Sequence, residues 1–366
     1  MRLRDLFKRS KQYDLTLSRH YVSKWTYLQA IRELLQNAID SESKFEFNFT
    51  GSTMSIHSRA STLTPRTLLL GTSSKTNDDS KIGQYGEGYK LAMLVLLRCD
   101  LKVKIFNGGV MWTPTFTYSE DFMEETLAII ETFLSKKYEG LTFVIEGLTA
   151  EQIDEIKRSC LHFSEYNVVH QCQYGEILPD YSHGGQLYVN GLFVCETKMK
   201  FGYNVKPEHL KLERDRQTVD SFELAFLTRD MWLSSRLYGI IEELIYKRVE
   251  DVKYFEYGGY RETKQGLSTS LATSFREKHP TAVAVSTQHE LQQATSEGRE
   301  AVIVPDEVIK LVHDNEIYRA PLKVPTVRVL TPTDQLNAFL SANRKHMRRY
   351  AIVEFKKLIE ESKKWK

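Results

Sequence analysis

Residues 33–40 read Glu33-Leu-Leu-Gln-Asn37-Ala-Ile-Asp40, and this stretch decides how the N-terminal part of the chain is expected to fold. On a helix, positions i, i+4 and i+7 share one face, so Glu33, Asn37 and Asp40 point the same way while the leucines face a core. Carboxylate and carboxamide oxygens suit a hard cation such as Mg²⁺, and a carboxylate can act as a base toward water. The stretch therefore predicts a magnesium-triphosphate site on a helix. The alternative is a surface helix that carries two acids and an asparagine.

The sequence around this helix predicts a domain of mixed helices and strands. Apolar residues recur at helical spacing over residues 21–42 and again over 89–98. Residues 45–57 alternate between apolar and polar side chains around a Gly-Ser turn, which is the pattern of a β-hairpin. The remaining predicted elements are strands near 101–106, 111–117 and 141–146 and a helix near 121–135.

A glycine-rich loop, Gly83-Gln-Tyr-Gly86-Glu-Gly88-Tyr-Lys90, runs directly into the second of these helices. Glycines let the backbone approach phosphate oxygens closely, and a helix N-terminus offers N–H donors and a favourable dipole. The loop differs from a dinucleotide-binding fingerprint because a polar segment precedes it, and from a P-loop because it lacks the Gly-Lys-Ser/Thr ending. It predicts phosphate binding, with an ordinary glycine turn before a helix as the alternative.

A hydroxyl-rich turn precedes this loop and is expected either to cover phosphate groups when it closes or to remain a solvated loop. Its residues are Gly71, Thr72, Ser73, Ser74 and Lys75. The Ser, Thr and Asp residues that follow it predict a mobile segment before the glycine-rich loop.

These three motifs, in this order, resemble the GHKL superfamily, which includes DNA gyrase, the ninety-kilodalton heat-shock chaperone, sensor histidine kinases and the mismatch-repair protein MutL. The resemblance covers residues 1–150 well and residues 150–250 loosely. It implies an α+β protein whose N-terminal domain is a Bergerat-type α/β sandwich that binds ATP with Mg²⁺ and hydrolyses it slowly. By the same resemblance, an N-terminal arm exchanged across a nucleotide-dependent homodimer is expected.

The resemblance also assigns roles to individual residues. Glu33 matches the general base that activates water, and Asn37 matches the ligand of the magnesium ion. Thr142, in the stretch Gly140-Leu-Thr-Phe-Val-Ile, matches a threonine that these folds place near the base. The remaining nucleotide contacts that the motifs imply are Asp40, Gly71, Thr72, Ser73, Ser74, Lys75, Gly83, Gly86, Gly88 and Lys90.

One motif departs from the family pattern. Between the hairpin and the hydroxyl-rich turn the family carries Asp-x-Gly-x-Gly, whose aspartate reads the adenine amino group, whereas this chain has Ser58-Arg59-Ala60-Ser61-Thr62. A serine hydroxyl can still form a hydrogen bond to the adenine, directly or through water, but it carries no charge and reaches less far. Loss of such a buried contact costs about 1–3 kcal/mol, so weaker adenine binding or relaxed base selectivity is expected.

Residues 151–255 are expected to form a transducer-like α/β segment. The pattern predicts an amphipathic helix at 150–162 that opens at Thr149. A hairpin at 185–200, turned at Asn190-Gly191, and a long helix at about 220–252 are predicted to follow.

Basic residues between that hairpin and the long helix are candidates for a contact with the γ-phosphate. In ATPases of the resembled superfamily a basic side chain from this region reaches back to the nucleotide, which implicates Lys211, Arg214 or Arg216. The alternative is a charged connection held by local ion pairs.

The C-terminal part of the chain carries no recognisable catalytic motif. Residues 256–270 are rich in Gly, Thr and Ser and predict a linker to a small α/β domain at 271–366. That domain is expected to run strand, helix, strand, helix and to end in a basic amphipathic helix at about 334–362. The basic side chains predict either a solvated face or contact with nucleic acid or an acidic protein partner.

Composition narrows the class of protein further. A chain of 366 residues exceeds what one core usually serves, and 50 basic against 48 acidic residues argue against a protein dedicated to coating nucleic acid. The four cysteines lack paired spacing, and the longest apolar run, residues 91–97, is too short to span a bilayer. A soluble cytoplasmic protein with two or three structural units and no membrane contact is expected.

The leading hypothesis is an ATPase whose lid closure, with dimerisation, drives a conformational change in a partner. The alternative is a nucleotide-binding scaffold that no longer hydrolyses ATP, which the degenerate adenine motif favours and Glu33 opposes. A histidine kinase is disfavoured because no helical pair with a phosphoacceptor histidine precedes the pocket. A topoisomerase is disfavoured because no nucleophilic tyrosine stands in a recognisable setting.

Overall fold

The protein is a mixed α/β chain in which helices alternate with mostly antiparallel strands. We describe it from a computed structural model, which defines two compact units, residues 1–267 and residues 268–366. The residues that the structure describes are 10–41, 44–69, 88–210, 219–255, 257, 261–319 and 331–363. None of the helices in these ranges combines the length and the apolar character needed to cross a bilayer.

A seven-stranded antiparallel sheet forms the centre of the first unit. Its strands, in spatial order, are β1 (Ser10–Ser18), β6 (Glu124–Phe133), β5 (Val110–Ser119), β4 (Lys102–Asn107), β7 (Leu141–Glu146), β3 (Thr53–Ser58) and β2 (Phe45–Thr50). The β2–β3 hairpin and strands β4, β5 and β7 confirm the elements predicted from the sequence.

The segment predicted as a helix at 121–135 is strand β6, so that prediction is wrong. Its sequence places apolar residues at spacings that satisfy a buried strand as well as a helix. The neighbouring strands decide between the two, because β6 pairs with β1 on one side and along its full length with β5 on the other. A strand that is paired on both sides has its backbone N–H and C=O groups hydrogen-bonded to its neighbours. This pairing outweighs any local preference for a helix.

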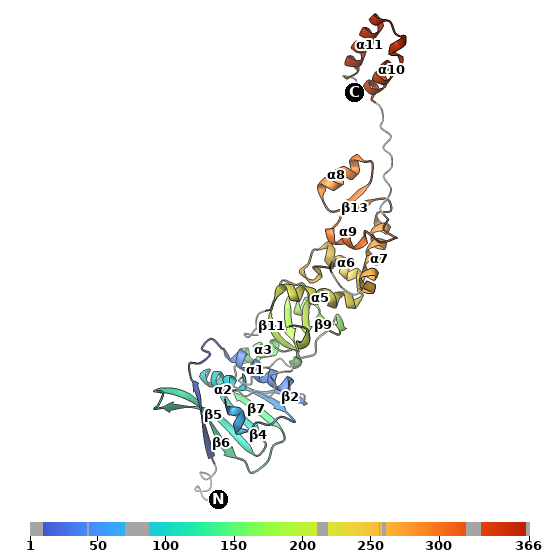
Figure 1. The fold of residues 1–366 in the computed structure, drawn as a ribbon. Coiled ribbons are helices and arrows are strands. Elements are labelled where there is room, and N and C mark those ends of the chain that lie inside the picture. Colours follow the sequence, from blue (N-terminus) through green and yellow to red (C-terminus); the bar gives the residue numbers. More distant parts are fainter. Residues whose placement is uncertain are drawn as a thin grey trace, which may run out of the picture. The chain divides into compact units, whose positions relative to one another are not determined.

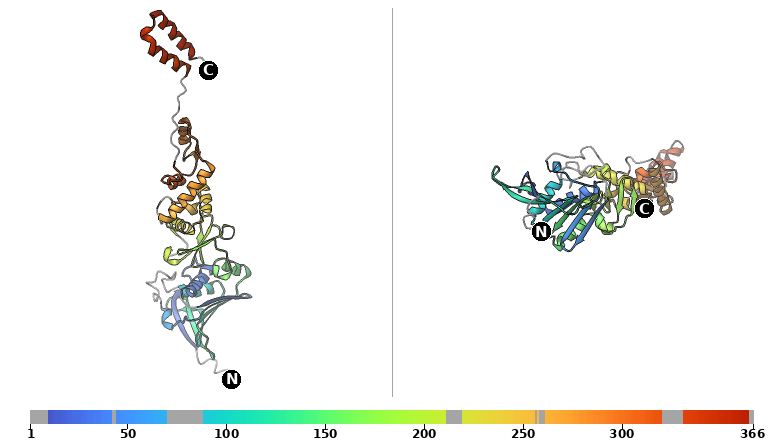
Figure 2. Two further views of the ribbon diagram at one scale, coloured as in Figure 1. Left: turned by 90° about the vertical axis from the view of Figure 1, so that its right-hand side faces the viewer. Right: turned by 90° about the horizontal axis from the view of Figure 1, so that it is seen from below.

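Two helices, α1 (Tyr27–Ile39) and α2 (Gly88–Arg98), pack against each other on one face of this sheet (Figures 1 and 2). α1 starts at a capping box formed by Thr26 and Gln29, which explains why it is shorter than the predicted range of 21–42. α2 confirms the helix predicted at 89–98, and it is buried from Tyr89 to Leu96. The core between helices and sheet includes Ala30, Ile31, Leu34, Met54, Ile56, Ala92, Met93, Val95, Ile105, Trp112, Leu127 and Ile145.

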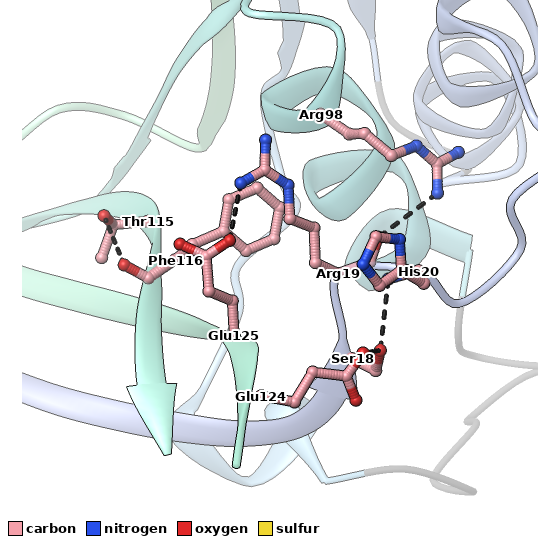
Figure 3. A network of polar contacts seen from close by, with 8 residues as sticks. All are labelled: Ser18, Arg19, His20, Arg98, Thr115, Phe116, Glu124 and Glu125. Atoms are coloured by element: carbon pink, nitrogen blue, oxygen red, sulfur yellow. Dashed lines mark hydrogen bonds and ion pairs between the residues drawn. The ribbon is translucent and has the colours of Figure 1, made fainter. Parts of the chain in front are cut away.

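Arg98, the last residue of α2, fastens the connection between β1 and α1. Its guanidinium donates hydrogen bonds of 2.9–3.4 Å to the backbone carbonyls of Arg19, Tyr21, Val22 and Trp25. Arg19 in turn pairs with Glu125 of β6 at 2.6 Å and lies over the ring of Phe116 (Figure 3). A planar guanidinium with five donors suits this role, because one side chain satisfies several carbonyls of an irregular segment.

A second sheet of five strands lies in the same unit. In spatial order the strands are β11 (Leu192–Glu196), β10 (Gln186–Val189), β12 (Gly202–Val205), β9 (Gly175–Leu178) and β8 (His170–Cys172). β10 and β12 are parallel, and the other pairs are antiparallel. The predicted hairpin is confirmed, with Asn190 (φ 49°) and Gly191 (φ 80°) at its turn, as a two-residue turn with two positive φ values requires.

The helices around the second sheet differ in part from the prediction. α3 (Ala150–Arg158) begins at Thr149 with a capping box, as expected. The long helix expected at about 220–252 is two helices, α5 (Ser221–Ser235) and α6 (Tyr238–Tyr246), because the chain leaves helical geometry at Arg236, whose φ is 55°. The short helical elements of this unit are η2 (Pro65–Leu68), η3 (Leu161–Phe163), α4 (Asp180–His183), η4 (Pro207–His209) and η5 (Glu250–Val252).

Residues 1–150 and 151–255, which the sequence divides into two domains, lie in one compact unit. Ile156 of α3, Cys160 and Leu192 of β11 are buried in the same hydrophobic core as α1, α2 and the seven-stranded sheet. An isolated β-bridge also joins Cys160 to Leu192. Because the apolar core continues past residue 150, the predicted boundary there does not separate two compact units.

The second unit begins inside the predicted linker at 256–270. Residues 261–270 of the predicted linker belong to a helix, α7 (Arg261–Lys278), whose Leu267 and Leu271 are buried. The predicted order of strand, helix, strand and helix is confirmed. These elements are β13 (Val283–Val285), α8 (Gln288–Ser296), β14 (Ala301–Ile303), which pairs in parallel with β13, and α9 (Asp306–Val312).

The single basic helix predicted at about 334–362 is a helical hairpin (Figure 1). α10 (Pro332–Asn343) and α11 (Arg349–Ser362) are joined through η6 (Arg344–His346). Phe339 and Phe355 stack between them with ring centroids 5.4 Å apart, and Leu340 and Ile359 are buried. The chain folds back because an isolated helix leaves such side chains in water, whereas two packed helices bury them.

A buried carboxylate, Asp251 of η5, ties β12 to the helices beside the second sheet. Its oxygens accept hydrogen bonds from Lys200 N at 2.6 Å, Phe201 N at 2.9 Å and the Tyr203 hydroxyl at 2.6 Å. The Trp232 indole of α5 donates to the same hydroxyl at 2.8 Å. Burial, together with the neighbouring carboxylate, raises the pKa of Tyr203 well above its ordinary value, so the hydroxyl stays a donor.

We expect Asp251→Asn to lower the free energy of unfolding by about 2–3 kcal/mol. Three hydrogen-bond donors surround the Asp251 carboxylate, and the NH₂ group of asparagine would face one of them and could not accept its hydrogen bond. Asp154→Asn on the exposed surface of α3 is the matched control and should change the free energy by less than about 0.5 kcal/mol. Urea unfolding followed by tryptophan fluorescence measures both variants. Equal effects of the two substitutions would show that the buried network does not stabilise the unit.

Candidate functional site

The predicted polar face of α1 exists, and its two acids are buried. Glu33 is 8% exposed and Asp40 is 5% exposed, while Asn37 between them is half-buried. Asp40 caps the C-terminus of α1, the end of a helix at which a negative charge is unfavourable. Charged side chains are seldom buried to this degree without a specific reason, and an acid at this end of a helix adds to the cost.

The start of α2 lies directly against Glu33. A Cβ atom placed on Gly88 would come within 2.1 Å of the Glu33 Oε2 atom, so only glycine fits here without moving the carboxylate. The predicted helix motif and the last glycine of the predicted glycine-rich loop therefore meet in space, although 55 positions separate them in the sequence. The N-terminus of α2 and the Glu33 carboxylate share one small region, where a ligand phosphate and a basic carboxylate would be neighbours.

Lys90 is placed differently from the expected phosphate contact. The side chain is completely buried, and its ammonium donates hydrogen bonds to the carbonyls of Thr67 at 3.0 Å and Leu69 at 2.5 Å. Tyr89 supports the same segment, because its hydroxyl donates to the Thr67 carbonyl at 2.7 Å and burial raises its pKa to about 12. Both residues of α2 thus position the end of the described segment that precedes the hydroxyl-rich turn.

Ser58, which stands where the family has an aspartate, ends β3 and is 5% exposed. Its side chain lies on the same face of the sheet as Met54 and Ile56, the face that α1 and α2 cover. Within the described part of the chain, no side-chain hydrogen bond involves the Ser58 hydroxyl. Ser58 is therefore a buried hydroxyl on the helix-covered face of the sheet.

Two residues that the sequence did not single out shape the backbone around Ser58. Gly140 has a φ of 71°, and a Cβ atom there would come within 2.3 Å of the Ser58 carbonyl oxygen. Asn107, 8% exposed, both donates to the Leu63 carbonyl at 2.7 Å and accepts from the Leu63 amide at 3.2 Å. The only local signal for them is the turn sequence Asn-Gly-Gly at 107–109 and the glycine before β7, because their partners are distant in the chain.

Thr142 does not lie beside Ser58, so its predicted place in the site is wrong. In the β3–β7 register Ser58 stands opposite Leu141, whereas Thr142 stands opposite His57 and bonds to its Nδ1 atom at 2.8 Å. Directly opposed residues share a face and successive residues alternate, so Thr142 lies on the sheet face away from α1 and α2. The apolar Leu141 occupies the position next to Ser58.

The remaining predicted site residues lie outside the residues that the structure describes. They are Gly71, Thr72, Ser73, Ser74, Lys75, Gly83, Gly86, Lys211, Arg214 and Arg216.

The side-chain oxygens on α1 could coordinate a magnesium ion whose other ligands come mainly from a bound phosphate compound and water. Magnesium keeps several waters and usually takes only one or two protein ligands together with substrate phosphates. Within the described ranges, no group of three or more His, Cys, Asp or Glu side chains could hold a metal alone. The Asn37 side chain forms no hydrogen bond within those ranges, so its carboxamide oxygen is available for this purpose.

Comparison with known protein families finds a match in the part of the chain that follows α2 and the seven-stranded sheet. Residues 151–236 match the family described as the Mycoplasma pneumoniae MPN635 N-terminal domain. An uncharacterized protein of Mycoplasma pneumoniae (strain ATCC 29342 / M129 / Subtype 1) is 24% identical over 213 residues, which span 53% of this chain and 86% of the relative. The family match contains the five-stranded sheet, α3 and α5, and it does not include Glu33 or Gly88.

The contact between Gly88 and Glu33 can be tested by stability alone. In the wild-type background we expect Gly88→Ala to lower the free energy of unfolding by about 1–3 kcal/mol, because the added methyl group displaces a buried carboxylate. In a Glu33→Ala background the same change should raise that free energy by up to about 1 kcal/mol, because alanine favours a helix more than glycine does.

Gly239→Ala in α6 is the matched control, since nothing lies within 4 Å of its added Cβ atom. It should have the same small effect in both backgrounds, as expected for sites that do not touch. Urea unfolding of the wild type, the three single variants and the two double variants completes both cycles. An effect of Gly88→Ala that does not depend on Glu33 would contradict the contact.

Proposed function

We propose that the first unit binds ATP with Mg²⁺ and hydrolyses it slowly, in a pocket between α1, the N-terminus of α2 and the end of β3. The proposal includes a Bergerat-type arrangement of the seven-stranded sheet with α1 and α2. It is supported by the resemblance of three sequence motifs to the GHKL superfamily. Two further observations support it: α1 carries Glu33, Asn37 and its C-cap Asp40, and Ser58 lies on the sheet face that the two helices cover.

One observation carries the proposal: the Glu33 carboxylate lies against Gly88 at the first turn of α2. A phosphate bound at that helix terminus would receive backbone N–H donors and the favourable end of the helix dipole. A carboxylate beside it is within reach of a water molecule that attacks the terminal phosphorus. This pairing of an anion-binding helix end with a buried base is what hydrolysis of a triphosphate needs.

The residues of the chain divide the work of the proposed reaction. Glu33 accepts the proton of the attacking water, and Asn37 supplies an oxygen ligand for the ion. Mg²⁺, when bound, supplies positive charge that offsets the negative charge of the phosphate oxygens. Lys90 acts indirectly. Its ammonium donates hydrogen bonds to the carbonyls of Thr67 and Leu69, which precede the hydroxyl-rich turn, and so positions that segment.

The alternative is a nucleotide-binding scaffold that does not turn over. It is favoured by the adenine end of the proposed pocket, where Ser58 replaces an aspartate, Leu141 lies beside it and Thr142 faces away. A pocket that has lost charge at the adenine but keeps Glu33 would bind the base weakly and still retain the hydrolytic group. Both forms of the proposal include closure of a lid over the nucleotide and a nucleotide-dependent homodimer. Both also include a partner protein that changes conformation in response.

The first test is isothermal titration with a non-hydrolysable ATP analogue and Mg²⁺, together with phosphate release from ATP. We expect Glu33→Ala to keep analogue binding within a few-fold and to lower turnover by at least about 100-fold, the usual contribution of a general base. Glu120→Ala, which removes an exposed glutamate on the β5–β6 connection, is the control and should leave both unchanged. Removal of Mg²⁺ with EDTA should weaken analogue binding.

Binding without measurable turnover in the wild type would establish the scaffold. Absence of analogue binding would refute both forms of the proposal. Turnover that survives Glu33→Ala at the wild-type rate would place the base elsewhere.

The substitution at the adenine end gives a second test. We expect Ser58→Asp to raise the preference for the ATP analogue over the GTP analogue by about tenfold or more, since a restored contact of this kind is worth about 1–3 kcal/mol. Ser55→Asp adds the same charge to β3 on the face turned away from α1, and it should leave the preference unchanged. Identical preferences in the two variants would mean that Ser58 does not contact the base.

A further inference from the structure

The turn of the C-terminal helical hairpin concentrates positive charge at one place. Residues 344–349 read Arg-Lys-His-Met-Arg-Arg, and we call this segment the basic tip. Its four permanent cations, Arg344, Lys345, Arg348 and Arg349, are all exposed. The basic tip contains no acid, so four positive charges lie within six consecutive residues.

Two lysines of the hairpin differ from the cations of the basic tip in a way that the sequence alone does not show. Lys357 pairs with Glu354 at 2.9 Å and Lys363 pairs with Glu360 at 2.6 Å, one turn away on α11. In contrast, none of the four cations of the basic tip forms an ion pair or a side-chain hydrogen bond with any residue in the described ranges. The helix face is therefore close to neutral, and the net charge of the hairpin resides in the turn.

The start of α11 adds to this positive potential. Its N-cap is Arg348, which makes no side-chain capping hydrogen bond, and its first turn contains no acid. The first backbone N–H groups of a helix and its dipole favour an anion, whereas two arginines at the same end are unfavourable. Positive side chains at the N-terminus of a helix lower the stability of the free protein. A bound anion would offset this repulsion.

The chemistry of the basic tip narrows the kind of anion. Guanidinium groups match phosphate oxygens through paired N–H donors, and three of the four cations are arginines. The segment exposes no apolar side chain of the kind that anchors a protein interface, since Met347 is half-buried. A membrane is a poor match, because Glu354, Glu360 and Glu361 are exposed along α11 and would face anionic headgroups.

We propose that the basic tip binds the phosphodiester backbone of a nucleic acid without reading its sequence. Contacts of arginine and lysine with phosphate oxygens fix a protein on a duplex and carry no sequence information by themselves. Four phosphate contacts on a DNA duplex release enough counterions to give a slope of about −3.6 in a plot of log K against log salt concentration. This interaction is independent of the proposed nucleotide pocket.

The test uses the full-length chain and a labelled DNA duplex of about 20 base pairs, with affinity measured by fluorescence anisotropy between about 50 and 200 mM NaCl. The double variant Arg348→Gln/Arg349→Gln removes two unpaired cations. It should make the slope shallower by about 1.8 and lower the affinity at the lowest salt concentration by at least about tenfold. The expected loss should be equal for duplexes of unrelated sequence.

The double variant Lys357→Gln/Lys363→Gln is the matched control, because it removes the same charge from cations that already have carboxylate partners. It should change affinity by no more than about twofold and leave the slope unchanged. Circular dichroism of both variants verifies that the hairpin remains helical. Absence of duplex binding, or equal losses in the two double variants, would overturn the proposal. Binding to phosphatidylglycerol vesicles without duplex binding would overturn it in favour of a lipid surface.

Discussion

The burial of α2 on all sides from Tyr89 to Leu96 is the constraint from which the rest of the first unit follows. From Tyr89 to Leu96 the helix presents buried residues on every side, so it needs cover from α1, from the sheet and from the segment before residue 70. Its first residue, Gly88, is pressed against an acid of α1, and its last, Arg98, holds the connection that leads into α1. Because both ends of α2 are fixed in this way, the position of the candidate site is set by the hydrophobic core.

Buried carboxylates serve two purposes in this unit. Glu131 accepts hydrogen bonds from the Trp112 indole at 2.8 Å and the Tyr13 hydroxyl at 3.3 Å, and Asp251 accepts three from its neighbours. These acids stabilise the fold, since donors from the same unit take up their charge. Asp40 is also buried, and it caps the C-terminus of α1, where an acid opposes the helix dipole. A residue that is locally unfavourable for the stability of the fold, as this acid is, is typical of functional positions.

Ile156 and Leu192 of the matched segment at 151–236 belong to the same hydrophobic core as α1 and α2. α3 contacts α1 directly, and the Tyr27 hydroxyl donates to Glu155 across that contact. Any movement of α1 that accompanies ligand binding would therefore reach the five-stranded sheet through packed side chains, without a hinge at residue 150. This continuity connects the proposed pocket with the segment at 151–236 that matches the family model.

The sequence by itself determined the features that depend on a few neighbouring residues. Helical spacing placed Glu33, Asn37 and Asp40 on one face, Thr149 marked the start of α3, and Asn190-Gly191 marked a hairpin turn. Only the tertiary structure decided the features that depend on partners far along the chain. Pairing with β1 and β5 made β6 a strand, the β3–β7 register turned Thr142 away from Ser58, and packing against Phe339 folded the last helix into a hairpin. The physical reason is that caps, turns and periodicity are local interactions, whereas strand pairing, register and the burial of Lys90 are set by the contacts that distant segments make when they pack.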